Sequence, residues 1–184
     1  MPQQHDWAPR LSPPFNGTVY RYTPHSATDP LDGSFAMRSG GRWNPPNSFP
    51  VLYTSCSLDG AIANLWDRFE GEAVQPWEVA EERQADLHEL RVSQSNLVDV
   101  VTPEGVAGVL LPPSYPEGVG HDQTQPVGTR LHGEGRPGVW CRSAALPKER
   151  EIALFLEFAD RPERTGAPKR LWEWFPVPED QKPA

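Results

Sequence analysis

A chain of 184 residues, 37% of them hydrophobic, is long enough to bury the core of one domain. Its 22 prolines interrupt nearly every stretch, which excludes a coiled coil or a helical repeat array. The net charge of −8 argues against nucleic-acid binding, because a phosphate backbone requires clustered lysines and arginines. No apolar run approaches the ~18 residues of a membrane span, and the N-terminal residues lack the apolar core of a signal peptide. We therefore expect no membrane association and a cytoplasmic protein.

The two cysteines and five histidines show no spacing typical of a metal site. Cys56 and Cys141 lie far apart and neither has a CxxC partner, so we interpret both as small buried side chains. No HExxH or related pattern occurs among the histidines. A bound metal is therefore not expected.

The N-terminal half of the chain predicts two strands, a long loop and a helix. Residues 1–16 are polar and proline-rich, and they predict a flexible lead-in. The β-branched, aromatic and apolar residues of 18–23 (TVYRYT) and 51–55 (VLYTS) predict strands. Between them, 25–50 is rich in turn residues, and we expect this loop to form a wall of a ligand cleft. Apolar residues at helical spacing predict a helix over 58–69, capped by the serine before it.

The C-terminal half predicts mostly short strands. A helix is expected over 124–133, and Pro126 restricts its beginning to a point near that residue. The polar residues 179–184 predict a disordered tail. Strands are expected over 85–92, 96–101, 138–141, 151–158 and 171–177. Because these strands are mostly not separated by helices, the sequence favours an α+β domain with a mainly antiparallel sheet.

Polar residues within apolar strands or at the mouths of loops are the candidates for chemistry, since common nucleotide-binding and hydrolase motifs are absent. Arg21 lies within a strand, and Arg42 follows two glycines. Two guanidinium groups suit a phosphate or carboxylate, although Arg21 alone is more typical of a strand edge or a structural ion pair. Trp43 and Tyr53 offer flat faces to a ligand ring, although each alone is more typical of a core. Ser143, taken alone, predicts only a surface serine.

Several segments occur in an order that resembles the RES domain family, named for its Arg, Glu and Ser. They are VYRYTP with DPLDG, GGRWNPP, VLYTSCSLDGAIA and GVWCRSA, and the resemblance runs from Gly17 to Phe158. It implies an ADP-ribosyltransferase-like fold and a single domain over 17–178. It also implies a bacterial toxin that consumes NAD⁺ by phosphorolysis or hydrolysis of the nicotinamide–ribose bond, or that ADP-ribosylates a protein. A helical antitoxin is the partner that the resemblance implies.

The resemblance also implies roles for the candidate residues. Arg21 and Arg42 would hold the pyrophosphate of NAD⁺, and Tyr53 would position the nicotinamide or the ribose. Ser143 would hydrogen-bond the ribose on the nicotinamide side or an incoming phosphate. Trp43 would add a flat face to the same binding site.

The sequence departs from the family pattern at the glutamate. That pattern places a glutamate eleven residues after the tyrosine, where this chain has Asn64. An amide can hydrogen-bond a ribose hydroxyl, but it brings no negative charge to an oxocarbenium-like centre. Asp67 lies three residues further on the same helical face and is one replacement, and Glu70 lies further round the helix. Otherwise the chain is a RES-like module that binds NAD⁺ or a partner with impaired or lost catalysis.

Overall fold

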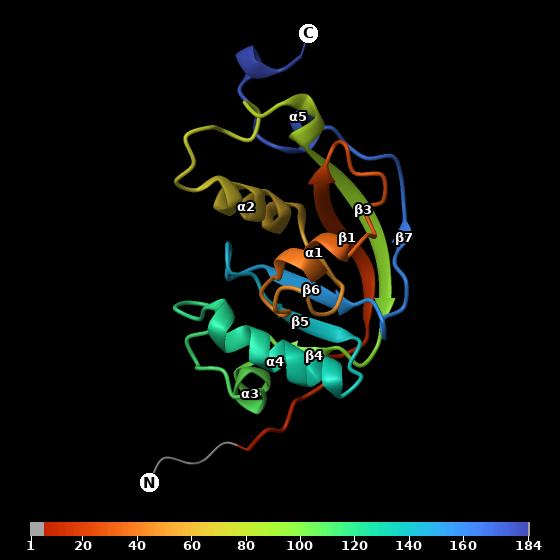
Figure 1. Cartoon of the computed structure of the whole chain (residues 1–184), viewed down its shortest axis with the longest axis vertical. Helices are drawn as coiled ribbons and strands as arrows, with labels where there is room; N and C mark the ends of the chain where they lie inside the picture. The colour runs from red at the N-terminus through yellow and green to blue at the C-terminus, as the bar shows by residue number, and fades with distance from the viewer. Residues whose placement is uncertain (1–5, 184) are drawn as a thin grey trace.

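The computed structural model describes residues 6–183, which form a seven-stranded sheet with helices packed against it (Figure 1). The strand order is β4-β5-β6-β2-β1-β3-β7. The strands are β1 (Phe15–Pro24), β2 (Val51–Ser55), β3 (Ala85–Gln94), β4 (Val98–Val100), β5 (Gly138–Arg142), β6 (Arg150–Phe155) and β7 (Glu163–Arg164). The helices are α1 (Ser34–Ser39), α2 (Leu58–Phe69), α3 (Pro103–Gly108), α4 (His121–Gly133) and α5 (Leu171–Trp174), with short 3₁₀ helices at Glu81–Arg83 and Glu179–Gln181.

Antiparallel pairing dominates this sheet. Of its neighbouring strand pairs, only β4 and β5 are parallel, and α3 and α4 lie in the connection between them. Such a connection is required there, because parallel strands cannot be joined by a tight turn. The expected α+β class with a mainly antiparallel sheet is confirmed.

The two faces of the sheet bury different sets of residues. Tyr53, Ala153 and Phe155 belong to the face covered by helices, where a core cluster includes residues of α3 and α4. On the opposite face, Leu52 and Leu154 pack in a second cluster. Figure 1 shows α3 and α4 beside β4 and β5, and α2 and α5 toward the other end of the helix-covered face. This alternation follows from the two-residue period of a strand.

Two elements next to the candidate site have the bounds that the sequence predicts. These are β2 and the helix α2 over 58–69. The hydroxyl of Ser57 accepts a hydrogen bond from the Gly60 amide at 3.0 Å, which satisfies one of the free N–H groups at the start of α2. Ala61 and Leu65 then point into a core cluster that also includes Leu171 of α5.

The predicted strand over 171–177 is wrong, because Leu171–Trp174 is helical. Leu171 and Trp174 are both buried, and their three-residue spacing suits one helical turn. The Arg170 amide donates to Glu173 Oε2 at 2.6 Å, which caps that turn. Aromatic residues favour a strand at this segment, but the spacing of its buried side chains has the period of a helix.

The segment between β4 and β5 holds more helix than the sequence predicted. Helix α3 had no expected counterpart, and α4 begins at His121 rather than near Pro126. Thr102 caps α3 by accepting from the Gly105 amide at 3.0 Å. Proline inside α4 removes one backbone donor, but Leu131 and Val127 of this helix are buried against the sheet and hold it in place.

The described residues at both chain ends form local structure or contact the sheet. The Ser12 amide donates to the Leu97 carbonyl and the Asp99 amide donates to the Arg10 carbonyl, both at 2.8 Å, so residues 10–12 of the lead-in 1–16 run beside β4. Residues 1–5 lie outside the described residues. The tail 179–184 begins with a 3₁₀ helix, and residue 184 lies outside the described residues. The loop 25–50 contains α1. No described helix is long and apolar enough to cross a bilayer.

Helix α4 approaches the backbone at Trp43 so closely that only glycine fits at position 128. A Cβ atom on Gly128 would overlap the Trp43 carbonyl, whereas one on Gly133 at the end of the same helix would meet nothing within 4 Å. We expect Gly128→Ala to lower the free energy of unfolding by ~1–3 kcal/mol, because backbone must move to relieve the overlap. Gly133→Ala is the matched control, and it should leave stability unchanged or raise it by up to about 1 kcal/mol. Urea unfolding of both variants measures the difference.

Candidate functional site

Strands β1 and β2 separate at the centre of the sheet. They share a single pair of register partners, Tyr20 and Ser55, whereas β1 pairs along its length with β3. Arg21 lies next to this separation and donates from Nη1 to the Tyr53 carbonyl at 3.2 Å and from Nη2 to the Asp32 carbonyl at 3.1 Å. The guanidinium therefore joins β2 to the loop that follows β1, in place of the missing ladder hydrogen bonds.

The side chain of Arg21 leaves β1 on the opposite face from the ring of Tyr53. Its register partner on that face is His88, whereas Tyr53 shares its face with Ser55. Burial lowers the pKa of Arg21, while the charge of Asp32 acts in the opposite direction. Its Nε is buried and has no hydrogen-bond partner among residues 6–183. The structure thus connects Arg21 to Tyr53 through a backbone carbonyl rather than through a shared side-chain surface.

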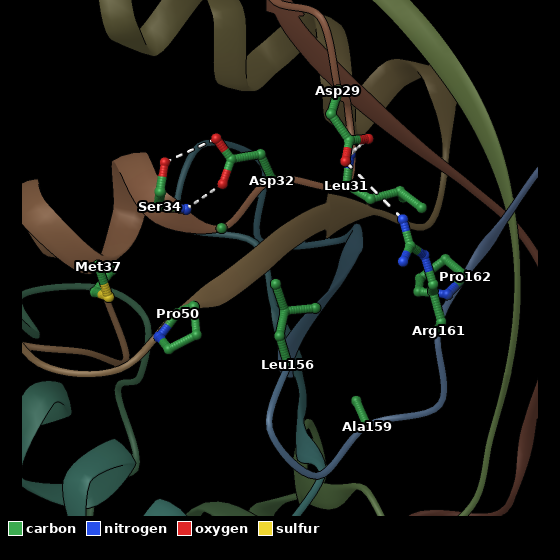
Figure 2. A pocket seen from close by; sticks show the side chains of 11 residues that line it. Asp29, Leu31, Asp32, Ser34, Met37, Pro50, Leu156, Ala159, Arg161 and Pro162 are labelled. Carbon is green, nitrogen blue, oxygen red and sulfur yellow. Dashed lines mark hydrogen bonds and ion pairs between the residues drawn. The ribbon is translucent and has the colours of Figure 1, made fainter.

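A pocket opens between the loop that leads into α1 and the segment that follows β6, and Figure 2 shows its lining. Asp29, Asp32, Ser34 and Arg161 provide its polar groups, and the Ser34 amide and hydroxyl both donate to Asp32. Arg21 is the only predicted site residue that approaches this pocket, through its hydrogen bond to the Asp32 carbonyl. The pocket is therefore separate from the surface around Asn64.

The hydroxyl of Tyr53 holds the loop between α1 and β2. It donates to Asn44 Oδ1 at 2.7 Å and accepts from the Trp43 amide at 2.9 Å. Asn44 is fully buried and donates from Nδ2 to the Ala36 carbonyl at 2.7 Å. Burial raises the pKa of Tyr53, so the hydroxyl keeps its proton at neutral pH. Sequence reasoning missed Asn44, whose only signal was its place directly after the arginine and tryptophan of GGRWN.

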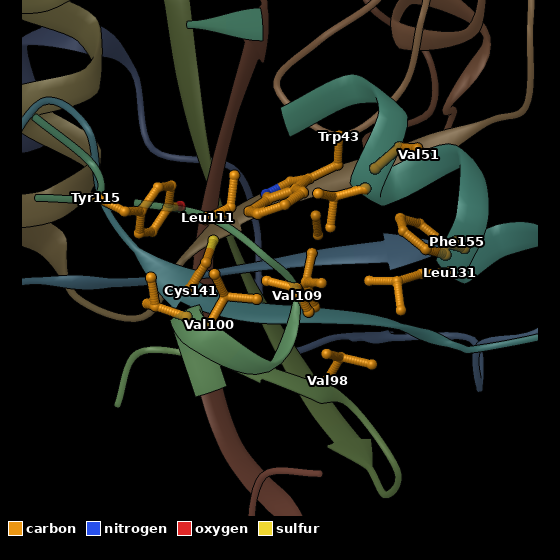
Figure 3. Close-up of a cluster of buried hydrophobic side chains, with 14 of the residues drawn as sticks. Trp43, Val51, Val98, Val100, Val109, Leu111, Tyr115, Leu131, Cys141 and Phe155 are labelled. Carbon is orange, nitrogen blue, oxygen red and sulfur yellow. The ribbon is translucent and has the colours of Figure 1, made fainter. Parts of the chain in front are cut away.

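Trp43 belongs to the core. Its side chain is 1% exposed and packs near Tyr115, with ring centroids 6.1 Å apart (Figure 3). The indole therefore has no free face for a ligand ring in this structure, and the expected stacking on Trp43 does not match its position.

Arg42 forms one side-chain hydrogen bond to the described residues, so most of its N–H groups are free. Its Nη1 donates to the Val119 carbonyl at 3.1 Å, and it forms no ion pair with any of residues 6–183. Burial, and next the charge of Arg42, lowers the pKa of His121 at the start of α4. An unpaired, half-buried guanidinium beside a helix N-terminus is well suited to an anion.

Asn64 points from α2 toward the central strands. Its Nδ2 donates to Ser55 Oγ at 3.1 Å and to Glu151 Oε1 at 2.7 Å. Its backbone carbonyl accepts from the Tyr22 hydroxyl at 3.3 Å. Sequence reasoning missed Glu151, which ends the charged stretch KERE directly before the apolar run IALF and so carried only a weak signal. Asn64, Ser55 and Glu151 form a polar group between α2 and the sheet, which we call the Asn64 cluster.

Ser143 directly follows β5 and has no exposed surface. Its amide donates to the Glu149 carbonyl at 3.0 Å, and its Oγ accepts from the Leu146 amide at 3.3 Å. The hydroxyl therefore closes a turn, and contact with a ligand requires this turn to open. The structure places Arg42, Tyr53, Asn64 and Ser143 on the helix-covered side of the sheet, and Arg21 across it.

Comparison with known proteins identifies the family. A family model described as RES domain matches residues 18–174. The chain belongs to the RES domain family. The RES fold also accounts for a structural likeness to the MbcT–MbcA toxin–antitoxin complex of Mycobacterium tuberculosis, with a TM-score of 0.75, 22% identity, and coverage of 89% of this chain and 90% of the other.

Sequence relatives of this RES domain include the NAD(+) phosphorylases MbcT of Mycobacterium tuberculosis and Mycobacterium bovis. Each is 36% identical over 87 residues, which are 47% of this chain and 46% of the relative. The matched segment therefore spans about half the length of these curated relatives.

The Tyr53 hydroxyl supports a prediction on stability. We expect Tyr53→Phe to lower the free energy of unfolding by ~1–3 kcal/mol, because it leaves the buried Asn44 Oδ1 without a donor. Tyr20→Phe is the control, since the Tyr20 hydroxyl forms no hydrogen bond with any of residues 6–183. Thermal unfolding of the two variants provides the comparison, and equal melting temperatures would contradict the role of Tyr53.

Proposed function

We propose that this RES domain consumes NAD⁺ by cleaving its nicotinamide–ribose bond, with phosphate or water as the acceptor. The observation that carries the proposal is the 36% identity to relatives named NAD(+) phosphorylase, within a family match over residues 18–174. The Asn64 cluster and Arg42 supply polar groups on the same side of the sheet, which supports a substrate that is both anionic and rich in hydroxyl groups.

In this proposal the pyrophosphate lies against Arg42, because that guanidinium has N–H groups to spare. Arg21 acts from the opposite face of the sheet, through the Tyr53 carbonyl that it holds in place and through its unpaired Nε. Tyr53 contributes its ring rather than its hydroxyl, since both hydrogen bonds of the hydroxyl are internal. Asn64 Oδ1 accepts a hydrogen bond from a ribose hydroxyl, and Ser143 contacts the ribose or phosphate when its turn opens.

A second candidate function follows from Asn64. The family glutamate is absent at this position, so a neutral amide faces the reacting ribose. A RES domain that binds NAD⁺ or a partner without cleaving it accounts for this replacement. The two candidates differ in one observable, the release of nicotinamide.

A protein antitoxin in the cytoplasm is the partner that fits an NAD⁺-consuming toxin. The support is the likeness to a toxin that was crystallised with its antitoxin. A protein acceptor of ADP-ribose is the other partner to test, and mass spectrometry of proteins incubated with the domain and NAD⁺ would detect it.

The deciding experiment incubates the purified protein with NAD⁺ in buffers with and without inorganic phosphate. Chromatography would measure released nicotinamide together with the second product. Phosphorolysis yields ADP-ribose carrying a new phosphate on the ribose, and hydrolysis yields free ADP-ribose. Bound but intact NAD⁺ in both buffers would reject cleavage and favour the binding module.

Arg42→Ala should weaken NAD⁺ binding more than it disturbs folding. A charged hydrogen bond contributes roughly 1.5–3 kcal/mol, so we expect an affinity loss of at least about tenfold by calorimetry. Arg38→Ala is the matched control, because Arg38 has the same charge and is exposed at the end of α1. An unchanged affinity accompanied by a collapsed melting temperature would assign Arg42 a structural role.

A further inference from the structure

Glu151 occupies an unusual place for a carboxylate. It lies in β6 between register partners on both sides, Ser55 of β2 and Cys141 of β5. The four residues that follow it in the strand are all buried. Glu151 itself is half-buried at the start of this buried run, so the partners of its carboxylate are informative.

The only side-chain partner of Glu151 among residues 6–183 is the neutral amide of Asn64. An ionised carboxylate can only accept hydrogen bonds, so the amide must direct its NH₂ group at Glu151 and at Ser55. Asn64 Oδ1 then points away with no donor from the described residues. The amide therefore orients Glu151 while its own oxygen stays available to a hydroxyl group.

The negative charge of Glu151 is not neutralised by an ion pair. No lysine, arginine or histidine among residues 6–183 forms a salt bridge with it. Its Oε2 has no hydrogen bond to these residues and is not a buried unpaired atom, so it is accessible. Burial, and next the charge of Glu151, raises the pKa of Cys56 to about 12. The field of this carboxylate thus extends across the neighbouring strands.

We propose that Glu151 supplies the catalytic carboxylate that position 64 lacks, an inference that rests on the proposed cleavage of NAD⁺. A glutamate at position 64 would be one methylene longer than Asn64, and its carboxylate would end where Glu151 Oε1 now accepts from the amide. In this chain the charge comes from β6 instead of α2. Asn64 is then a positioning residue that holds the carboxylate and accepts from the ribose.

The reaction step is electrostatic and forms no covalent bond to Glu151. The bond between ribose C1′ and the nicotinamide nitrogen breaks, and its electron pair leaves with neutral nicotinamide. Positive charge then develops on the ribose, and Glu151 stabilises it more than it stabilises the intact substrate. An oxygen of phosphate or water bonds to C1′ and releases its proton to solvent.

The helical alternatives to Glu151 are less well placed. Asp67 and Glu70 are both exposed, and neither side chain hydrogen-bonds the Asn64 cluster. Asp67 lies about one turn beyond Asn64, toward the C-terminal end of α2. The direct contact therefore favours Glu151 over either residue.

Glu151→Gln tests the charge while keeping the size of the side chain. We expect nicotinamide release to fall ~10²–10³-fold, the usual effect of removing one group that stabilises charge in the transition state. Binding of NAD⁺ by calorimetry should change by no more than about threefold, since the interaction belongs to the transition state. Glu157→Gln is the matched control, because Glu157 is an exposed carboxylate just past β6 that contacts His132, and it should leave turnover unchanged.

An exchange of the two residues provides a second, independent test. Asn64→Glu combined with Glu151→Asn keeps both the net charge and the summed side-chain length across the contact. We expect this double variant to recover most of the turnover that Glu151→Gln loses. Asn64→Glu alone should not raise turnover. The new carboxylate at position 64 would repel Glu151, which raises the pKa of one of the two, and the hydrogen bond from the position-64 amide to Glu151 would be lost.

The outcomes separate this inference from the proposed function. If the natural protein releases no nicotinamide with either acceptor, the proposed function and this inference both fail. If the natural protein is active and Glu151→Gln retains more than half of its turnover, cleavage stands and Glu151 is not the carboxylate. Loss of turnover in Asp67→Asn alone would assign the role to Asp67. If Glu151→Gln does not fold, a folded but inactive exchange variant overturns the inference.

Discussion

The hydrogen bonds of the Tyr53 hydroxyl are the constraint on which the helix-covered side of the sheet depends. They connect β2 to Asn44 and to the Trp43 amide, and so they determine how the loop before β2 crosses the sheet. With the loop held there, the indole of Trp43 enters the core and α4 packs against its backbone at Gly128. Arg42, one residue earlier, is left half-buried beside the start of α4. A single phenol thus links core packing to the position of an unpaired cation.

The Asn64 cluster places a second, opposite charge on the same side of the sheet. Glu151 is held by an amide rather than by a cation, so its charge is oriented without being neutralised. A salt bridge in its place would stabilise the ground state and weaken the field that a developing cation experiences. A half-buried carboxylate that is oriented by an amide and left without an ion pair is consistent with a functional use.

The separation of β1 and β2 distinguishes this sheet from a continuous antiparallel one. Only Tyr20 and Ser55 pair across it, and Arg21 replaces further ladder bonds with side-chain bonds to two carbonyls. Arginine suits this place because its planar fork can donate in two directions while part of it remains buried. The same geometry explains why Arg21 and Tyr53, which the sequence assigned to one binding site, emerge on opposite faces.

Local pattern in the sequence was sufficient for α2, its Ser57 cap and β2, because apolar period and capping depend on residues close together in the chain. The order of the predicted elements indicated the α+β class, and the order of short motifs indicated the family. It failed at 171–177, where the partner of the buried face lies far away in α2. The contact between Asn64 and Glu151 spans 87 positions and depends on the register of β6 against β2. Likewise, the flat ring of Trp43 could stack on a ligand as far as the sequence shows, and only its packing under α4 places it in the core. The sequence determined which residue types were available for chemistry, and tertiary structure decided which of them meet, because strand register is set by burial over the whole sheet.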